Sequence, residues 1–466
     1  MKINRKKAMN NIGIALLLLS IAASFKVGNS YPVLIVSLPL IIINRAFVIP
    51  FLFSVETIKG AVSLDDGISP AEAFSVAMAC LVLPFDLLKN HKNLVPFKLT
   101  KYYILFPILA ILGFYVWILH PQIASASHNT ILGIYFKFSA KIFLVIFCFF
   151  LLKVHINYRK DTFLEMLDIL SLVIPYLIFL VTLYLFTFGQ VSGQFSVAHF
   201  GDAHHGEFTA DLCALGAYLY IMLYDKKRNV YHKILCILAL LALLLVVLKM
   251  ASRNGIICYA LSAMLCLYTV FKKKSTFKKF AFIMVGVIMG TGVLFFAQDS
   301  PTIQRFIFKT EVEAGGDRLD YWYSGIQAFF KEPLFGLGGD ESSSIYAVSI
   351  YEPGVVPHVM HNTFLEMAVE YGTIGFVFYM ALFFTIMWCA YKNFLYAIES
   401  DQYILAVPSI SYSIVMFSAL FISRVWQLTI WYHLTLVLAV YIIWVYPRER
   451  QVKLTAAMPK LKKQLA

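Results

Sequence analysis

The sequence predicts an all-α membrane protein, a polytopic helical bundle of about 12 transmembrane helices with one large polar loop near its C-terminal third. Of its 466 residues, 60% are hydrophobic and only 14% are charged, whereas soluble domains are about 45–50% apolar. The apolar residues gather in long runs, and the charged residues form short clusters between them. Backbone groups in lipid must pair within the segment that crosses, so these runs predict helices.

The basic clusters between the apolar runs set the expected orientation, because positively charged loops stay in the cytoplasm. The loops of one alternating set, with the N-terminus, hold 27 Lys and Arg, against seven in the other set. The second set, which is expected outside, comprises 54–69, 120–129, 189–207, 251–254, 298–363 and 423–426. The apolar runs lie at 11–25, 31–53, 70–88, 102–119, 130–152, 163–188, 208–224, 234–250, 255–271, 280–297, 364–391, 403–422 and 427–446.

The first 60 residues conflict with this orientation. Counting back from the C-terminus puts loop 54–69 outside, whereas the basic N-terminus belongs inside. Two full spans before residue 54 would put loop 54–69 on the same side of the membrane as the N-terminus. Either residues 11–53 therefore cross the membrane once in net terms, or one segment there is miscounted. The expected domains are 1–297 with the first ten transmembrane helices, the large loop 298–363, the last transmembrane helices in 364–446, and a basic cytoplasmic tail at 447–466.

Composition excludes several other classes of protein. The net charge is +13, but the basic residues lie at helix ends, which indicates topology signals and lipid headgroup contacts rather than nucleic acid binding. All seven cysteines fall within apolar runs. We therefore expect no structural disulfide and no zinc site built on thiolates.

The loop 298–363 is long enough to hold structure of its own. Asp317 can cap a short amphipathic helix that Pro333 ends. This helix either lies on the outer membrane surface or covers a small core beneath the loop. Residues 336–339, with three glycines, are expected to form a flexible connector. The residues at helical spacing are Leu319, Trp322, Tyr323, Ile326 and Phe330.

Two arginines on the outward side are candidates for binding an anion. Arg253 lies at the tip of the hairpin between runs 234–250 and 255–271, where it either clamps an anion or snorkels into solvent. Arg318 lies at the start of the expected loop helix. Its alternative role is a surface ion pair with a neighbouring aspartate.

A third candidate, His361, comes just before run 364–391. The positive end of that helix is expected to lower the pKa of His361 and favour the neutral imidazole. A neutral imidazole can accept a proton, as a general base must. The alternative is a histidine that only hydrogen-bonds the loop. Thr363 and Glu366 fit a capping box, which gives Glu366 a structural explanation.

Other polar residues are weaker candidates for substrate binding. Arg424 faces outward and is either a third anion contact or a helix-end anchor. His204 lies in a histidine-rich loop whose spacing fits no helical metal-ligand pair; it is a candidate substrate contact. Lys137 and Lys141 lie inside run 130–152, where charges are costly and usually functional, and they can attract lipid phosphates. Gly372 and Gly375 are expected to allow close helix packing.

In combination, the motifs are similar to those of a known family. The chain resembles the O-antigen ligase and O-antigen polymerase superfamily of bacterial envelope glycosyltransferases, and the resemblance covers most of the chain. Four motifs carry it in order. They are Ser252-Arg253-Asn254-Gly255, then Asp317-Arg318 leading to Tyr321-Trp322, then Glu332-Pro333-Leu334-Phe335-Gly336-Leu337-Gly338, and last His361-Asn362-Thr363-Phe364-Leu365-Glu366 continuing to Glu370-Tyr371-Gly372-Thr373-Ile374-Gly375.

The resemblance implies an inverting, metal-independent glycosyltransferase of the bacterial inner membrane, with short helices in its large periplasmic loop. Such enzymes move a glycan from undecaprenyl diphosphate to an acceptor hydroxyl. Arg253 and Arg318 would hold the diphosphate, His361 would activate the acceptor, and Asn362 would bind substrate. No cofactor or metal is expected. The implied partners are the lipid-linked donor, a glycan or lipid A-core acceptor, membrane lipids and a chain-length regulator protein, without nucleic acid.

Within this class we favour a polymerase of O-antigen or exopolysaccharide repeat units, with the O-antigen ligase as the alternative. Two other classes stay open. A transporter of a lipid-linked oligosaccharide would place charges near the middle of the membrane, as Lys137 and Lys141 do, but no internal repeat is visible. A non-catalytic scaffold would tolerate replacement of Arg253, Arg318 and His361.

Overall fold

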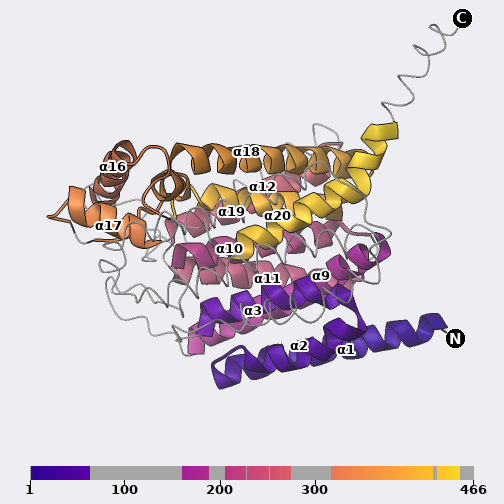
Figure 1. Cartoon of the computed structure of the whole chain (residues 1–466). Coiled ribbons are helices and arrows are strands. Elements are labelled where there is room, and N and C mark those ends of the chain that lie inside the picture. The colour runs from indigo at the N-terminus through magenta and orange to yellow at the C-terminus, as the bar shows by residue number, and fades with distance from the viewer. Residues whose placement is uncertain are drawn as a thin grey trace, which may run out of the picture.

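The computed structural model describes residues 2–62, 160–187, 205–226, 228–250, 252–273, 316–338, 341–355, 357–422 and 428–451. Within these ranges every regular element is a helix (Figure 1), which confirms the predicted all-α class. The α-helices are α1 (Lys2–Val27), α2 (Tyr31–Ile43), α3 (Val48–Val62), α9 (Lys160–Thr187), α10 (His205–Tyr224), α11 (Val230–Lys249), α12 (Arg253–Phe271), α16 (Gly316–Lys331), α17 (Glu341–Tyr351), α18 (Thr363–Glu399), α19 (Val407–Ser418) and α20 (Leu428–Val440).

Six helices in the described ranges are long and apolar enough to cross a membrane. Two shorter apolar helices, Tyr31–Ile43 and Tyr403–Ser418, accompany them. The spans expected at 70–88, 102–119, 130–152 and 280–297 lie outside the described residues, so the total of 12 stays a prediction. The six segments are Met9–Val27, Asp161–Thr187, Val230–Lys249, Arg253–Phe271, Thr363–Glu399 and Thr429–Gln451.

The chain turns at Asn44, between α2 and α3. Its side-chain amide donates to Asn10 Oδ1 and to Glu165 Oε1, each at 3.0 Å, so the end of α2 returns to the beginning of α1. Its side-chain oxygen also accepts from the backbone of Ala46, which starts a new helical segment leading into α3. The single run expected at 31–53 is therefore wrong. The chain reverses direction between α1 and α2 and again between α2 and α3. Of these helices only the segment Met9–Val27 is long and apolar enough to cross a membrane, so the number of spans here stays a prediction.

Helix α10 forms the centre of the bundle. It packs against α3, α9, α11, α12 and α19, which together surround it. Its apolar side chains, including the fully buried Tyr218, therefore meet protein on all sides rather than lipid. This enclosure explains how one helix carries Glu207 and Asp211 within the bundle without breaking the membrane-facing surface.

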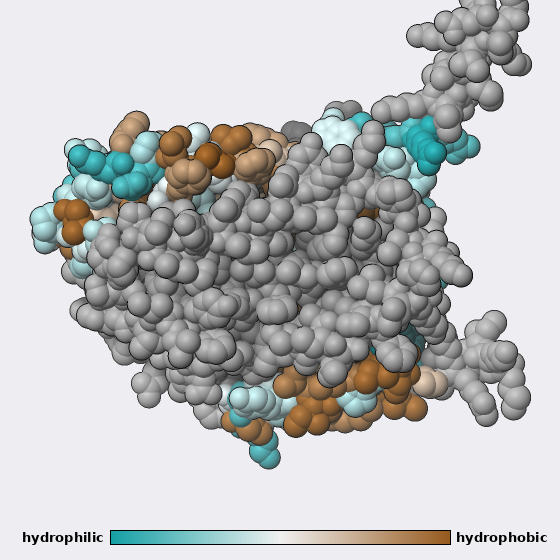
Figure 2. All heavy atoms as spheres, in the orientation of Figure 1, coloured by the Kyte–Doolittle hydropathy of each residue, from teal (hydrophilic) through white to brown (hydrophobic). Residues whose placement is uncertain are grey.

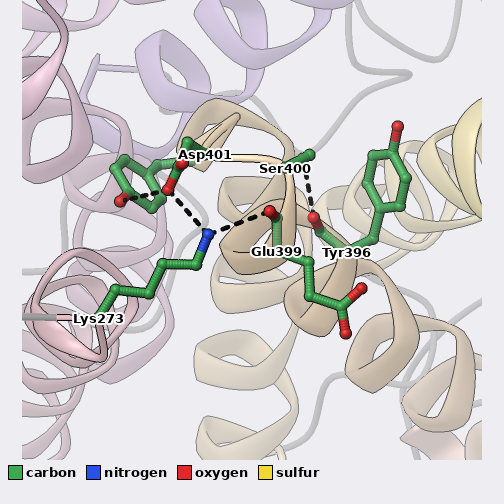
Figure 3. Close-up of polar contacts among 6 residues, drawn as sticks. Lys273, Tyr396, Glu399, Ser400 and Asp401 are labelled. Carbon is green, nitrogen blue, oxygen red and sulfur yellow. Dashed lines mark hydrogen bonds and ion pairs between the residues drawn. The ribbon is translucent and has the colours of Figure 1, made fainter.

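Ion pairs join several helices at one end of the bundle. Lys273, just after α12, donates to the Glu399 backbone carbonyl at 3.0 Å and pairs with Asp401 at 3.1 Å (Figure 3). It thus satisfies a carbonyl at the C-terminus of α18, where a cation also complements the helix dipole. Arg448 pairs with Glu399 at 2.7 Å on the other side. This end, where α1 begins (Figure 1), is the one that the basic loops predict to be cytoplasmic.

Helices α16 and α17 lie together at the opposite end (Figure 1). They cover a second, small core of Ala328, Leu337, Ala347, Met360 and Val369. Of the apolar residues that predicted the loop helix, only Trp322 is partly buried; the other four are exposed. A core beneath the loop therefore exists, but it is built mainly from the opposite face of α16. The helix begins at Gly316, so Asp317 lies in its first turn rather than before it.

Helix α18 is broken at Gly372, which has φ 60° and ψ −167°. The break frees backbone groups on both of its sides, and the segment 333–338 pairs with them. We call this arrangement the clasp. Because the four backbone groups of α18 are satisfied by the clasp, the break is stable at this depth of the bundle. The bonds are Leu337 N to Val369 O at 2.8 Å, Gly338 N to Glu370 O at 2.9 Å, Thr373 N to Pro333 O at 2.7 Å and Ile374 N to Leu334 O at 3.3 Å.

Two glycines make the clasp possible. A Cβ on Gly372 would lie 2.4 Å from the carbonyl carbon and oxygen of Leu334, and a Cβ on Gly336 would lie 2.4 Å from the Val369 carbonyl oxygen. Both residues have positive φ, at 60° and 75°, where side chains are disfavoured. The expectation of a flexible connector at 336–339 is therefore wrong for Gly336 and its neighbours. Gly372 admits the backbone of the clasp rather than another helix.

Candidate active site

The motif Ser252-Arg253-Asn254-Gly255 builds the N-terminus of α12. The Ser252 hydroxyl caps the helix by accepting from the Gly255 backbone at 3.0 Å. Gly255 packs against α10, because a Cβ there would lie 2.7 Å from the Thr209 hydroxyl. The Asn254 amide bridges two other helices, donating to the Gly206 carbonyl at 3.2 Å and to the Ser418 hydroxyl at 3.0 Å. Three residues of the motif are thus explained by packing, and the fourth, Arg253, is not.

Arg253 has an unusual electrostatic environment. Its Nε is buried and has no hydrogen-bond partner among the described residues. The Nε of Arg228, in one of the basic loops, also has no hydrogen bond, but its guanidinium forms ion pairs with Asp168 and Asp225. A guanidinium at the first residue of a helix also meets the positive end of the helix dipole, which disfavours a cation and favours an anion. The N-terminus of α12 is therefore suited to an anionic ligand.

Helix α18 begins beside His361, and its cap differs from the expected one. Asn362 is the cap, because its side-chain oxygen accepts from the backbone of Phe364 and Leu365, each at 3.1 Å. The expected capping box of Thr363 and Glu366 is wrong. The Glu366 side chain is instead buried, with 2% of its surface exposed. The reason is that Thr363 turns its hydroxyl toward another segment of the chain.

That segment, residues 418–422 after α19, connects the two helix N-termini. The Thr363 backbone donates to the Ala419 carbonyl at 3.0 Å, and the Thr363 hydroxyl donates to the Ile422 carbonyl at 2.7 Å. Asn254 holds Ser418 at the start of the same segment. The starts of α12 and α18, with Arg253 and His361, therefore lie at the same end of the bundle, around one short piece of chain.

Helix α16 covers the backbone that carries His361. The Trp322 indole donates to the Met360 carbonyl at 2.9 Å. The Tyr321 ring stacks on His358 with centroids 6.0 Å apart, and it lies 6.4 Å from the His361 ring. Arg318 is one helical turn before Tyr321, so it lies on the face of α16 that meets this group. Packing between α16 and the loop before α18 therefore places Arg318 one helical turn from Tyr321, whose ring lies 6.4 Å from that of His361.

The backbone of His361 is strained. Its φ is +53°, a value that non-glycine residues adopt rarely. Its side chain is 9% exposed, beside the fully buried Met360 and the cap Asn362. Strain of this kind persists only where the surroundings fix the residue, and it is concentrated at functional sites. The fold therefore holds the imidazole of His361 in one defined position.

Asn362 offers a test that separates a cap from a substrate contact. Asp caps helices as well as Asn does, whereas Ala costs about 1 kcal/mol. We expect Asn362→Ala to lower the thermal stability of the purified protein and Asn362→Asp to preserve it. A substrate contact through the amide would appear as a raised KM in Asn362→Asp at unchanged stability. Equal stability of all three proteins would contradict the capping role.

The remaining candidates, Arg424, Lys137, Lys141 and His204, lie outside the described residues. Two of them are close in sequence to residues of the site. Ile422, whose carbonyl binds Thr363, is two residues before Arg424. His204 directly precedes His205, where α10 begins near Asn254. Their roles in substrate binding stay predictions.

Fold and site together define a polytopic membrane protein with a helix N-terminus suited to an anion at the end opposite its basic loops. Residues 237–380 match the family model described as O-antigen ligase. This match confirms the resemblance to the O-antigen ligase and polymerase superfamily and supports an enzyme of that type. The matched residues include Arg253, Arg318 and His361. No curated protein sequence matches the chain.

The structure adds two residues to the site that the sequence had not singled out. His358 is exposed and lies 4.7 Å from His361 between ring centroids, and Tyr321 contacts both histidines. His358 lies three residues before His361 in a segment without helical periodicity, so no sequence pattern placed it beside His361. Tyr321 lies within a resemblance motif, but its spacing gave no reason to expect contact with a histidine 40 residues away.

Proposed function

We propose that the chain is an inverting glycosyltransferase that takes its glycan from undecaprenyl diphosphate at the periplasmic face of a bacterial inner membrane. Within this class we propose a polymerase that joins O-antigen or exopolysaccharide repeat units. The observation that supports the proposal best is Arg253, a permanent cation at a helix N-terminus whose buried Nε has no partner among the described residues. A diphosphate would supply the missing negative charge.

The proposed reaction breaks the bond between the anomeric carbon and the diphosphate. The acceptor hydroxyl loses its proton to His361 while its oxygen attacks the anomeric carbon from the opposite side. The electron pair of the broken bond stays on the diphosphate, which leaves as a more highly charged anion. Arg253 and Arg318 would stabilise that charge, and fixed cations of this kind provide a large part of catalysis by other enzymes. In this proposal the two guanidinium groups take the place of a metal ion.

The contacts at the end of α19 are consistent with these separate roles of the two arginines and His361. Asn254, next to Arg253 on α12, and Thr363, two residues after His361, both hydrogen-bond to the same segment, 418–422. Arg318 is carried by a separate helix, α16, that packs on His358 and Met360. In this proposal the diphosphate is held from two elements, α12 and α16, and the acceptor from a third, the loop before α18.

The matched family description favours one alternative acceptor, the lipid A-core of an O-antigen ligase. A deletion strain separates the two reactions by gel electrophoresis of its glycolipids. For a polymerase we expect single repeat units on lipid A, because ligation continues without chain growth. Long polymer stranded on the lipid carrier would instead identify a ligase.

A transfer assay with the purified protein in detergent separates either enzyme from a transporter. No membrane is present to cross, so formation of a glycosidic bond requires catalysis by the protein itself. Absence of transfer in detergent and in reconstituted vesicles would contradict the proposal.

A further inference from the structure

The outward face of α16 carries a regular apolar stripe. Leu319, Tyr323, Ile326 and Phe330 recur at intervals of four, three and four residues, which places them on one face of the helix. They are 46–72% exposed, although each is large and hydrophobic. The opposite face of α16 is already used by the small core of Ala328 and Met360. The stripe is therefore not needed to hold the helix on the protein.

The depth of the clasp in the membrane follows from α18. Lys392 marks the cytoplasmic interface, because it pairs with Glu449 at 3.0 Å and lies 5.4 Å from the centre of the Trp388 ring. A hydrocarbon core of about 30 Å takes about 20 residues at 1.5 Å each. Counting about 20 residues outward from Lys392 reaches Gly372. The helix break and the clasp therefore lie at the outer boundary of the hydrocarbon.

The stripe is continuous with the lipid-facing surface of α18. Between the two interfaces α18 exposes Ile374, Val377 and other apolar side chains. The clasp bonds Ile374 to Leu334, and Leu334 and Phe335 are themselves exposed. They follow Phe330, the last residue of the stripe, by four and five residues. Figure 2 shows hydrophobic residues running along α18 toward the end that carries α16.

We propose that α16 lies in the outer interface of the lipid bilayer, with this stripe inserted among the lipids. Aromatic and aliphatic side chains on one face of a short helix are typical of helices that lie in the membrane surface. Arg318 directly precedes Leu319, so insertion of the stripe holds its guanidinium at the depth of lipid phosphate groups. This consequence for Arg318 rests on the proposed function. It would allow a membrane-embedded lipid diphosphate to reach Arg318 without leaving the leaflet.

The test is the depth of a nitroxide spin label on the full-length protein in phospholipid nanodiscs. Phe330→Cys places the label on the stripe. Lys331→Cys, the matched control, places it on the next residue, which is also exposed and points about 100° away. The parent chain treated with the same reagent gives the background from its own seven cysteines; the five within the described ranges are buried.

We expect the label at residue 330 to collide severalfold more often with dissolved oxygen, and severalfold less often with a water-soluble nickel chelate, than the label at residue 331. Equal access of the chelate to both positions would show that the stripe faces water and would overturn the proposal. Shielding of residue 330 from both probes, in nanodiscs and in detergent, would overturn it in favour of a protein partner or a second copy. Neither accessibility measurement depends on glycan transfer, so the proposed position of α16 can be disproved while the proposed reaction stands.

Discussion

Alanine in place of Arg253, Arg318 or His361 is expected to lower glycan transfer by about a hundredfold or more, because each loses a group that acts on the transition state. The protein should still accumulate in the membrane. Arg253 makes no polar contact through its buried Nε with the described residues, so its removal breaks no such bond. The measurement is the rate of transfer from a lipid-diphosphate donor, normalised to the amount of protein in the membrane.

Two further variants help to interpret this experiment. Arg253→Lys keeps the charge but loses the bidentate hydrogen bonding of a planar guanidinium to phosphate, so we expect it to retain only part of the transfer rate. Arg228→Ala serves as the matched control, because Arg228 is paired with Asp168 and Asp225 in a basic loop. Near wild-type transfer by all three alanine variants would rule out the proposed site and would favour a scaffold.

Breaking the clasp should have the second-largest effect. Gly372→Ala forces a side chain into a backbone conformation used almost only by glycine, which costs about 1–3 kcal/mol, and into contact with the Leu334 carbonyl at 2.4 Å. Overpacking of this kind costs about 1–3 kcal/mol. Gly336→Ala also places a side chain at a positive φ, 75°, and its Cβ would lie 2.4 Å from the Val369 carbonyl oxygen. We expect a lower melting temperature and severe loss of transfer in each variant.

Loss of transfer is expected because the clasp ties α16 to α18. Without it, Arg318 on α16 would no longer be held against the loop that carries His361. Gly354→Ala is the control, since a Cβ there would have no atom within 4 Å. Its stability and activity should match those of the parent chain. Should the Gly336 and Gly372 variants also melt and transfer like the parent, the backbone pairing between 333–338 and α18 would have no role in the active protein.

Much of the architecture was predictable from the sequence. The run expected at 163–188 is helix α9 at 160–187, and the run expected at 234–250 is helix α11 at 230–249. The basic loops identified the end where Lys273 and Arg448 form their ion pairs. These predictions worked because a helix in lipid satisfies its backbone within four residues, so its position depends on local hydrophobicity.

The site was predictable only in part. Charge and resemblance singled out Arg253, Arg318 and His361, because each is a polar residue on an outward loop within a motif. His358 and the capping role of Asn362 were not predicted. Both depend on a turn of the chain at His361, where φ is +53°, and a short motif does not determine that turn.

The sequence by itself determined which segments form helices, which side of the bundle is basic, and which residues are available for chemistry. The tertiary structure alone decided that residues 31–53 form two helices, that Asn362 caps α18, and that Gly336 meets Gly372. Each of these depends on hydrogen bonds or close contacts between residues far apart in the chain, such as Asn44 with Glu165. A break in a membrane helix needs partners from elsewhere for its freed backbone groups, and only the folded chain supplies them.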